Sequence, residues 1–364
     1  MKITVVRENL LKALQRTGSA VGNRSTMAVL GNVLLEAVDG KLRLSATDLE
    51  IRVSTEVEAV VEKEGSTTLP AKKLLALVSK FIDPEVAIEV DERHHATVVC
   101  GTSTFKLLGI APADFPEPAD VAPVREIKFK GADLKRMLTQ IIYAASLDGS
   151  RQVLHGVLVS LKDHMVAMVA TDGKRLALVE RAPEEFSGTE GNAIIPLRSA
   201  GELRKMAEAD DTVELAIGEK QAVFKSGSTV LLTKLIDGNY PNYRQVIPAS
   251  FATSLQVPAI PFMQKIELVS QVLANTSSYV TLTFENDQLQ ILGKSPEIGE
   301  GSAIQEINYA GERIATSFNP AFLLDPLRCS EVEEVTIKIN DGFSPVAIQG
   351  GEGFLYIIMP MRDH

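Results

Sequence analysis

The pattern of apolar and polar positions predicts a unit that runs strand, helix, strand pair, helix and closing strands. Residues Ile3–Val6 alternate as a half-buried strand does, and three leucines within residues 8–16 follow at helical spacing. The dipeptide Asp39-Gly40 stands between two alternating segments, which is a strong signal for a two-residue hairpin turn. The other predicted elements of this unit are strands at 33–37, 42–45, 86–90, 97–100 and 105–108, and a helix that begins after Pro70.

The same order of elements occurs three times along the 364 residues. The segment VLGNVLLEAVDGKLRLSATDLE begins at Val29, and VLHGVLVSLKDHMVAMVATDGKRL begins at Val153. Ala46-Thr47-Asp48 therefore recurs as Ala170-Thr171-Asp172, and a fainter copy, SSYVTLTFENDQLQILGKSPE, begins at Ser277. The period is far longer than that of a solenoid repeat, so each copy is interpreted as a domain.

Each predicted domain is α+β, with two helices on one face of a mostly antiparallel sheet. Proline-rich stretches separate the copies and place the domains at residues 1–122, 126–252 and 253–364. In the second and third copies we expect helices at 132–143, after Pro196, at 260–274 and after Asn319-Pro320, hairpins around Lys162-Asp163 and Asn286-Asp287, and strands at 127–129, 213–217, 222–225, 230–234 and 356–359.

The composition is ordinary for a globular protein, and the length suits two to three domains. The N-terminal residues contain no long apolar run, so we expect no signal peptide. No segment approaches the roughly 18 consecutive apolar residues of a membrane span. Cys100 and Cys329 lie in different copies without a C-x-x-C spacing, which argues against a zinc site or a disulfide framework. We therefore expect a cytoplasmic protein.

The charges are distributed unevenly. The whole chain has a net charge of −10, whereas the predicted helices of the first two copies are net positive. One interpretation is that solvated helix surfaces are often rich in lysine. The other is that a basic face among acidic ones admits DNA only where the helices point. The residues that the second interpretation places toward DNA are Lys12, Arg16, Lys72, Lys80, Lys135, Arg136, Arg198 and Lys205. No aromatic residues interleave them and no base-reading motif is present, so we expect phosphate contacts without sequence specificity.

Motifs that carry chemistry are missing. The chain has no phosphate-binding glycine loop, zinc-protease motif or nucleophile elbow. His94-His95 stands beside Glu92 and Arg93, where a solvated turn is a better interpretation than a metal site. Asp48 and Asp172 recur with the domain period, and we expect turn residues rather than a paired-carboxylate site. Nothing in the sequence sets the geometry for a triad of His155, Asp172 and Ser160. We predict no catalytic residue, no metal and no cofactor.

Several segments together resemble one family over essentially the full length of the chain. They are Leu30-Gly31-Asn32, Leu34-Leu35, Thr47-Asp48-Leu49-Glu50, Ala113-Asp114-Phe115-Pro116, ATDGKRLA at 170–177, Lys234-Leu235-Ile236-Asp237-Gly238, Tyr240-Pro241-Asn242-Tyr243-Arg244 and Met359-Pro360-Met361-Arg362. In this order and spacing, the segments resemble those of the bacterial sliding clamp family. This family is the β subunit of bacterial DNA polymerase III.

The resemblance implies three domains of the DNA clamp fold and a head-to-tail homodimer whose six domains close a ring. Helices would line a hole that passes double-stranded DNA. The function that it implies is that of a non-catalytic processivity factor, which tethers the replicative polymerase and docks other replication and repair proteins. The implied partners are the DNA polymerase III alpha subunit, an ATP-driven clamp loader and other proteins with a clamp-binding motif.

The resemblance also implies site residues. Arg24 and Arg151 match DNA-contacting arginines of the family, although Gln152 and Val153 stand where the family often has aromatic residues. An apolar pocket for partner peptides is implied at Leu154, Thr171, Gly173, Arg175, Leu176, Pro241, Val246, Ile357 and Met359, with Met361 nearby. Lys174 and Gln245 depart from the family's usual histidine and arginine at the rim. The implied dimer contact joins the edge strand around Phe105 and Leu107 to the third-domain helix around Val272 and Leu273.

Two other classes of function remain as alternatives at this point. A nuclease or glycosidase could use Asp48 and Asp172 across the repeats, although the missing metal and nucleophile motifs argue against it. A peptide-binding adaptor could use the apolar pocket without encircling DNA. Reversal of the charges of Lys72 and Lys80 separates an adaptor from a clamp, since an adaptor would be indifferent to it.

Overall fold

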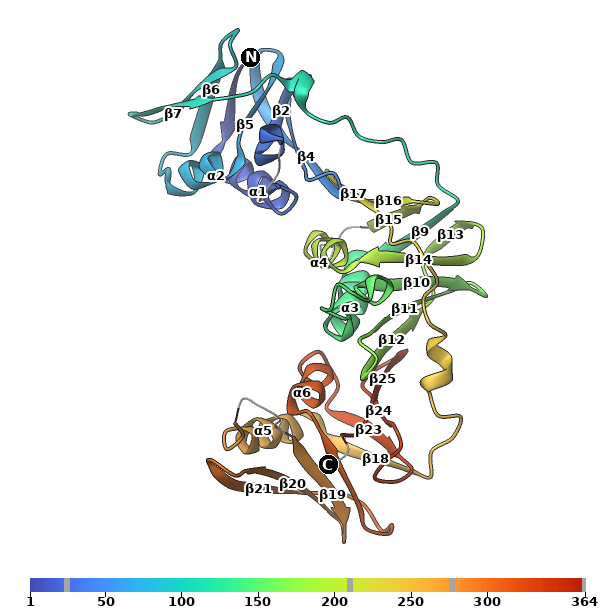
Figure 1. The fold of residues 1–364 in the computed structure, drawn as a ribbon. Helices are drawn as coiled ribbons and strands as arrows, with labels where there is room; N and C mark the ends of the chain where they lie inside the picture. The colour runs from blue at the N-terminus through green and yellow to red at the C-terminus, as the bar shows by residue number, and fades with distance from the viewer. Residues whose placement is uncertain (23–26, 208–211, 275–278, 362–364) are drawn as a thin grey trace. The chain divides into compact units, whose positions relative to one another are not determined.

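The computed structural model describes residues 1–22, 27–207, 212–274 and 279–361 (Figure 1). The chain divides into two compact units. Unit 1 comprises Met1–Lys135, Glu184–Thr189 and Gly201–Leu235, and unit 2 comprises Arg136–Pro183, Glu190–Ala200 and Ile236–His364. The first repeat therefore lies in unit 1 and the third in unit 2, while the second repeat contributes strands to both.

The first repeat contains the predicted elements in the predicted order, together with two strands that were not predicted, at residues 51–63 and 65–70. The prediction of a tight hairpin is confirmed at Asp39 and Gly40, whose φ angles of 49° and 74° are both left-handed, as a type I′ turn requires. Its strands are β1 (Lys2–Val6), β2 (Asn32–Val38), β3 (Lys41–Thr47), β4 (Ile51–Lys63), β5 (Gly65–Pro70), β6 (Glu85–Val90), β7 (His95–Cys100) and β8 (Ser103–Leu108), and its helices are α1 (Arg7–Gly18) and α2 (Ala71–Lys80).

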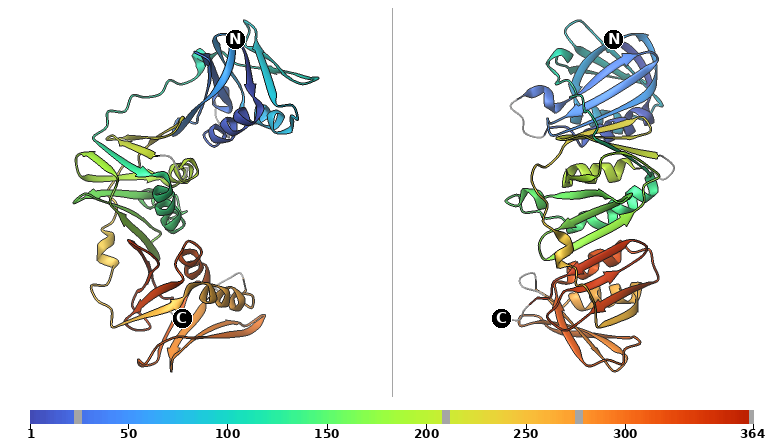
Figure 2. Two further views of the ribbon diagram at one scale, coloured as in Figure 1. Left: turned by 180° about the vertical axis from the view of Figure 1, so that it is seen from behind. Right: turned by 90° about the vertical axis from the view of Figure 1, so that its right-hand side faces the viewer.

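Helices α1 and α2 pack together on one face of this sheet, which the views of Figure 1 and Figure 2 both show. Leu10 and Leu14 of α1 and Leu74 and Val78 of α2 are almost fully buried. Burial of each such side chain stabilises the fold by about 1.5–3 kcal/mol. The apolar residues recur at helical spacing, so the charged residues between them face solvent.

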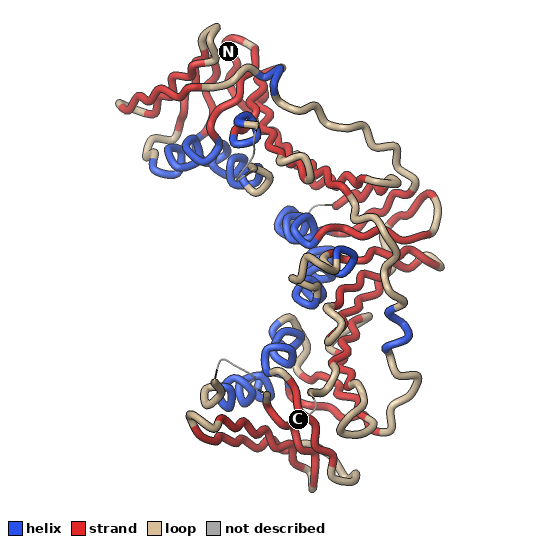
Figure 3. Tube along the Cα trace, in the orientation of Figure 1, coloured by secondary structure: helices blue, strands red, loops and turns tan. Residues whose placement is uncertain are grey.

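Strand β4 was not predicted from the sequence. With 13 residues, it is the longest strand among the described residues. Its first half pairs with β17 (Thr229–Lys234) of the second repeat, and its second half pairs with β1 of the first. One sheet thus runs in the order β13 (Glu185–Gly188), β9 (Arg125–Lys130), β15 (Thr212–Ile217), β16 (Gln221–Ser226), β17, β4, β1, β6, β7 and β8. Figure 3 shows β4 as a single unbroken strand.

The second repeat has the predicted strands and three further ones, at residues 175–181, 185–188 and 191–196. Its first helix ends earlier than predicted, at Ile141, and continues as a short 3-10 turn over Ile142–Ala144. The elements are β9 (Arg125–Lys130), α3 (Gly131–Ile141), β10 (Gly156–Lys162), β11 (Met165–Thr171), β12 (Arg175–Arg181), β13 (Glu185–Gly188), β14 (Gly191–Pro196), α4 (Leu197–Met206), β15 (Thr212–Ile217), β16 (Gln221–Ser226) and β17.

The third repeat lies wholly in unit 2. Its first helix ends at Ser270, so the prediction of a helix to 274 is wrong in its last turn. Val272 packs instead against Gly301 of strand β21 (Gly299–Glu306), and Leu273 packs against Gly293 of strand β20 (Gln288–Ser295). The elements are β18 (Thr253–Pro258), α5 (Ala259–Ser270), β19 (Val280–Glu285), β20 (Gln288–Ser295), β21 (Gly299–Glu306), β22 (Ile314–Phe318), α6 (Pro320–Arg328), β23 (Glu334–Ile339), β24 (Val346–Gln349) and β25 (Phe354–Ile358).

Unit 2 contains a sheet in the order β14-β10-β11-β12-β25-β24-β23-β18 and a second sheet in the order β21-β20-β19-β22. The linker after Leu235 crosses the first sheet, packing Tyr240, Tyr243 and Phe251 on a cluster that includes Leu176 and Ile357. Figure 3 shows this linker as a loop with one short helical turn. In the part of the chain that the structure describes, every helix is too short or too polar to cross a bilayer.

Candidate nucleic-acid interface and peptide pocket

The centre of the predicted peptide pocket is the turn between β11 and β12. The Thr171 hydroxyl accepts from the Gly173 amide at 3.1 Å and donates to the Arg175 carbonyl at 2.6 Å. The Asp172 carboxylate accepts from the amides of Lys174 and Arg175. Gly173 has a φ of 87°, a conformation that glycine adopts without strain. The expectation that Asp172 is a turn residue is confirmed.

Arg175 lies inside this region rather than on its surface. Its guanidinium donates through Nε to Asp172 at 3.1 Å and through Nη1 to Asp325 of α6 at 2.5 Å. Nη2 donates to the Tyr143 carbonyl, and the guanidinium lies over the Phe322 ring, 4.2 Å from its centroid. With a side-chain exposure of 10%, Arg175 can shape a pocket wall but offers little surface to a peptide.

The other predicted pocket residues divide into a buried group and an exposed group. Leu154, Leu176 and Ile357 are 7%, 2% and 1% exposed, and Leu176 and Ile357 belong to one buried apolar cluster. The Met359 amide donates to the Lys174 carbonyl at 3.0 Å, which fixes the C-terminal segment beside the turn. The exposed group is Pro241, Val246, Met359 and Met361. Methionine suits a surface that must adapt to several peptides.

A separate groove of about 760 Å³ lies on the same unit, between the linker and strands β10, β11, β12 and β14. Only Pro241 belongs to both this groove and the predicted pocket. Tyr240 and Tyr243 form one wall of the groove. Burial raises the pKa of the Tyr240 hydroxyl well above its usual range. At its rim Arg244 forms an ion pair with Glu180 at 2.9 Å. Apart from the aromatic linker residues, no pattern in the sequence indicates this groove.

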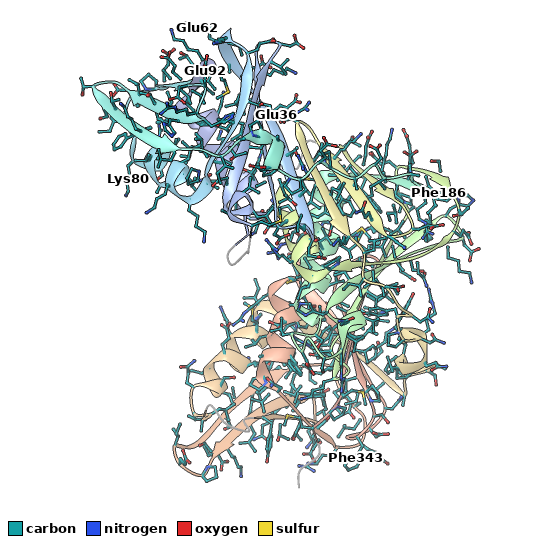
Figure 4. All side chains as sticks on the ribbon, turned by 45° about the horizontal axis from the view of Figure 1, so that its top comes forward. Glu36, Glu62, Lys80, Glu92, Phe186 and Phe343 are labelled. Atoms are coloured by element: carbon teal, nitrogen blue, oxygen red, sulfur yellow. The ribbon has the colours of Figure 1, made fainter. Side chains whose placement is uncertain are left out.

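The eight basic residues predicted to face DNA are all exposed and all stand on helices. Lys12 and Arg16 are on α1, Lys72 and Lys80 on α2, Lys135 and Arg136 on α3, and Arg198 and Lys205 on α4. Figure 4 shows Lys80 projecting from the end of α2. Some of the eight also have protein partners: Arg136 pairs with Glu331 at 2.8 Å and Lys205 with Glu202 at 2.8 Å. An ion pair as exposed as Arg136–Glu331 is weak and exchangeable.

Of the two arginines implied by the family resemblance, Arg24 lies outside the described residues. Arg151 is exposed and follows a tight loop in which the Asp148 carboxylate accepts from the Ser150 amide at 2.9 Å. Its Nη1 lies 3.1 Å from the position that a Cβ on Gly173 would take. Arg151 therefore stands directly beside the turn of the predicted peptide pocket.

The residues predicted for the dimer contact differ in accessibility. Phe105 is 39% exposed on β8, the edge strand of its sheet, with its ring centroid 5.8 Å from that of Phe81. Leu107 is half-buried on the same strand. Val272 and Leu273 are also half-buried and pack against Gly301 and Gly293 of their own domain. Strand β21 is an edge strand of the third repeat's sheet.

The geometry gives no support to the enzyme alternative. Asp48 accepts from the amides of Glu50 and Ile51, as Asp172 does in the second repeat, so both carboxylates serve turns. His155 Nδ1 bonds to the Ser146 carbonyl at 2.8 Å, whereas Asp172 is engaged with Arg175, and no triad forms. Within residues 1–22, 27–207, 212–274 and 279–361, no group of three potential ligands is placed to hold a metal ion.

Comparison with known proteins gives one family. Models of the DNA polymerase III beta subunit match the chain in three consecutive parts, the N-terminal domain at residues 1–119, the central domain at 128–242 and the C-terminal domain at 244–362. The Beta sliding clamp of Escherichia coli (strain K12) is 31% identical over 367 residues, with full coverage of both chains.

Solved structures agree, again with full coverage of both chains. The sliding clamp from Bacillus subtilis has a TM-score of 0.95 at 26% identity. The DnaN sliding clamp from Bartonella birtlesii, bound to griselimycin, has a TM-score of 0.93 at 31% identity. The chain therefore belongs to the DNA polymerase III beta subunit family, the bacterial sliding clamps, which are non-catalytic processivity factors.

Proposed function

We propose that two copies of the chain associate head to tail into a closed ring of six clamp domains that encircles duplex DNA. The observation that carries this proposal is the presence of two edge strands, β8 in the first repeat and β21 in the third. An edge strand presents unpaired backbone N–H and C=O groups, which proteins usually cover. Pairing β8 of one copy with β21 of the other would satisfy these groups on both strands. A head-to-tail contact closes into a ring when the rotation between copies suits.

The distribution of charge supports DNA inside the ring. The exposed helix residues Lys12, Arg16, Lys72, Lys80, Lys135, Arg136, Arg198 and Lys205, together with Arg24 and Arg151, would contact phosphates. The chain as a whole carries −10, so its other surfaces repel DNA. Because phosphate contacts are alike along a duplex, the ring can slide without sequence preference.

The turn at Thr171–Arg175 and the C-terminal Met359 would form the pocket that holds partner peptides. Its residues are Leu154, Thr171, Gly173, Arg175, Leu176, Pro241, Val246, Ile357, Met359 and Met361. The expected partners are the DNA polymerase III alpha subunit, the clamp loader and other proteins with a clamp-binding motif. The related Bartonella birtlesii clamp binds griselimycin, which supplies a probe for this site.

The same proposal covers domain boundaries, dimer contacts and location. The family matches at 1–119, 128–242 and 244–362 support domains at 1–122, 126–252 and 253–364. The dimer contact would use Phe105, Leu107, Val272 and Leu273, with burial of the exposed Phe105 as its apolar centre. A protein that works on the bacterial chromosome would be cytoplasmic.

The decisive experiment compares retention on circular and linear DNA. The full chain is loaded onto a nicked circular plasmid with a bacterial clamp loader and ATP, and bound protein is measured after gel filtration. A topological ring stays on the circle and is lost when a restriction enzyme linearises it. Equal retention on both forms would overturn the ring, and retention on neither would favour the peptide-binding adaptor.

A further inference from the structure

The chain has two junctions between consecutive repeats, and both contain the same kind of turn. At residues 47–51 the Thr47 hydroxyl accepts from the Leu49 amide at 3.1 Å and donates to the Ile51 carbonyl at 2.9 Å. The Asp48 carboxylate accepts from the next two amides, both at 3.0 Å. These are the same four hydrogen bonds, in the same order, as those made by Thr171 and Asp172 in the second repeat.

The neighbouring chain follows the same plan. The Lys234 amide donates to the Glu50 carbonyl at 3.0 Å, as the Met359 amide donates to the Lys174 carbonyl at 3.0 Å. Strand β17 lies beside β4 as β25 lies beside β12. Four pocket residues at the second junction therefore have counterparts at the first: Leu49 for Gly173, Arg52 for Leu176, Leu232 for Ile357 and Lys234 for Met359.

The side chains at these positions differ in size. Leu49 has a φ of 78°, close to the 87° of Gly173, so a bulky residue is held in a conformation that favours glycine. It is 46% exposed, so its apolar side chain stands at the surface of the turn. At the second junction a Cβ on Gly173 would meet only the end of the Arg151 side chain, whereas the first junction carries a leucine at this place.

The floor of the junction also differs. Arg52 occupies the place of Leu176, and its guanidinium lies 5.2 Å from the centroid of the Phe115 ring and donates to the Pro116 carbonyl at 2.6 Å. At the same junction, Glu50 and Lys234 form an ion pair at 2.9 Å. The Arg52 side chain is thus held in place by its contacts with Phe115 and Pro116 of its own chain.

The difference extends along the same face of the two sheets. The strand registers place Arg43, Ser45 and Ser54 of the first repeat where the second has Ala167, Val169 and Leu178. Ser45 and Ser54 bond to each other at 2.9 Å, and Arg43 pairs with Glu56 at 2.6 Å. The second junction therefore continues into an apolar cluster that the linker residues Tyr240, Tyr243 and Phe251 cover, whereas the first junction continues into polar and charged side chains.

We propose that Leu49 and Arg52 close the first junction to partner peptides, whereas Gly173 and Leu176 in the same places open the second. Each chain then presents one peptide site although its fold supplies two equivalent junctions. This is specificity by exclusion, since an unwanted site is filled rather than absent. The inference rests on the proposed peptide pocket at residues 171–175.

The first test converts the open junction into the closed one. Gly173→Leu should weaken griselimycin binding by at least about tenfold in isothermal titration calorimetry on the full chain. The fold should survive, because Leu49 already tolerates this conformation and a new Cβ meets only the mobile end of Arg151. Gly173→Ala is the matched control, since it adds the same backbone strain with little volume and should retain most of the affinity. Wild-type affinity in Gly173→Leu would overturn the proposal.

The second test is a gain of binding, which misfolding cannot imitate. The double variant Leu49→Gly, Arg52→Leu should bind a second griselimycin per chain, while the wild type binds one. A stoichiometry that stays at one would overturn the role of these two side chains. Wild-type protein that binds no griselimycin would instead overturn the proposed pocket, and this inference with it.

Discussion

Arg175 and Asp325 form an ion pair that is largely withdrawn from solvent, with Nη1 and Oδ2 2.5 Å apart and side-chain exposures of 10% and 26%. Arg175 begins β12 of the second repeat, and Asp325 lies on α6 of the third. The same guanidinium also binds Asp172 and covers the Phe322 ring. One cation therefore ties a strand of one repeat to a helix of the next.

Asp325→Ala should lower the free energy of unfolding of unit 2 by about 3 kcal/mol, since it leaves a buried guanidinium with one partner fewer. Differential scanning calorimetry on the full chain measures this as a lower Tm. The matched control is Glu352→Ala, which breaks the Arg181–Glu352 pair at 2.6 Å, where the carboxylate is 88% exposed. That change should cost less than about 1 kcal/mol. Equal effects of the two variants would contradict the prediction.

The double variant Lys72→Glu, Lys80→Glu should weaken binding to duplex DNA and reduce the salt dependence of that binding. Two lost phosphate contacts lower the slope of log affinity against log salt by about 2. Fluorescence anisotropy with a labelled duplex measures the slope. The control reverses two exposed lysines away from the helices, Lys220 and Lys225. The same slope in both double variants would remove α2 from the DNA interface and favour an adaptor.

Phe105→Glu should convert the dimer to monomers, because it places a charge at the proposed apolar contact on an edge strand. Analytical ultracentrifugation of the full chain reports the change as a halved mass. Phe343→Glu is the control, because Phe343 is 83% exposed on the turn before β24, and Figure 4 shows it projecting from the surface. A Phe105→Glu variant that sediments like the wild type would place the dimer contact elsewhere.

The turn before β24 should weaken in acid. The Asp341 carboxylate accepts from the Phe343 amide at 2.7 Å and from the Ser344 amide and hydroxyl, and these bonds lower its pKa. A depressed pKa stabilises the folded form above the unfolded pKa, and this contribution is lost as pH falls through the folded pKa. A carbon-detected NMR titration should find the Asp341 pKa below its ordinary value, and higher in Ser344→Ala. An unshifted pKa in the wild type would disprove the hydrogen-bonded turn.

The hairpins and the core helices could be predicted from local sequence. The turn at Asp39-Gly40 is confirmed, and so is the one at Asn286 and Asp287, where both residues have positive φ. The end of α5 could not be predicted, because it is set by the packing of Val272 and Leu273 on glycines of other strands. Strand β4 alternates clearly in sequence, but its length depends on two partners that are far away along the chain.

The contacts of the Arg175 side chain also could not be predicted from the sequence. The motif ATDGKRLA places an arginine next to the pocket turn, which suggests a ligand contact. Its main partner, Asp325, is 150 residues away, and no local pattern connects the two. The sequence repeats Ala-Thr-Asp, which indicates the duplicated turn. That Leu49 and Gly173 occupy equivalent positions is shown only by their similar backbone φ angles.

The long strand β4 also sets the order in which the protein can mature on the ribosome. Thr55 of β4 finds its partner Thr229 on β17, 174 residues further along the chain. At synthesis rates of about 5–20 residues per second, that partner arrives roughly 10 to 35 seconds later. Throughout this interval the first half of β4 is an exposed edge that another nascent chain could capture. The first repeat thus presents this edge throughout that interval of translation, and a fragment that ends with the first repeat would keep the edge exposed permanently.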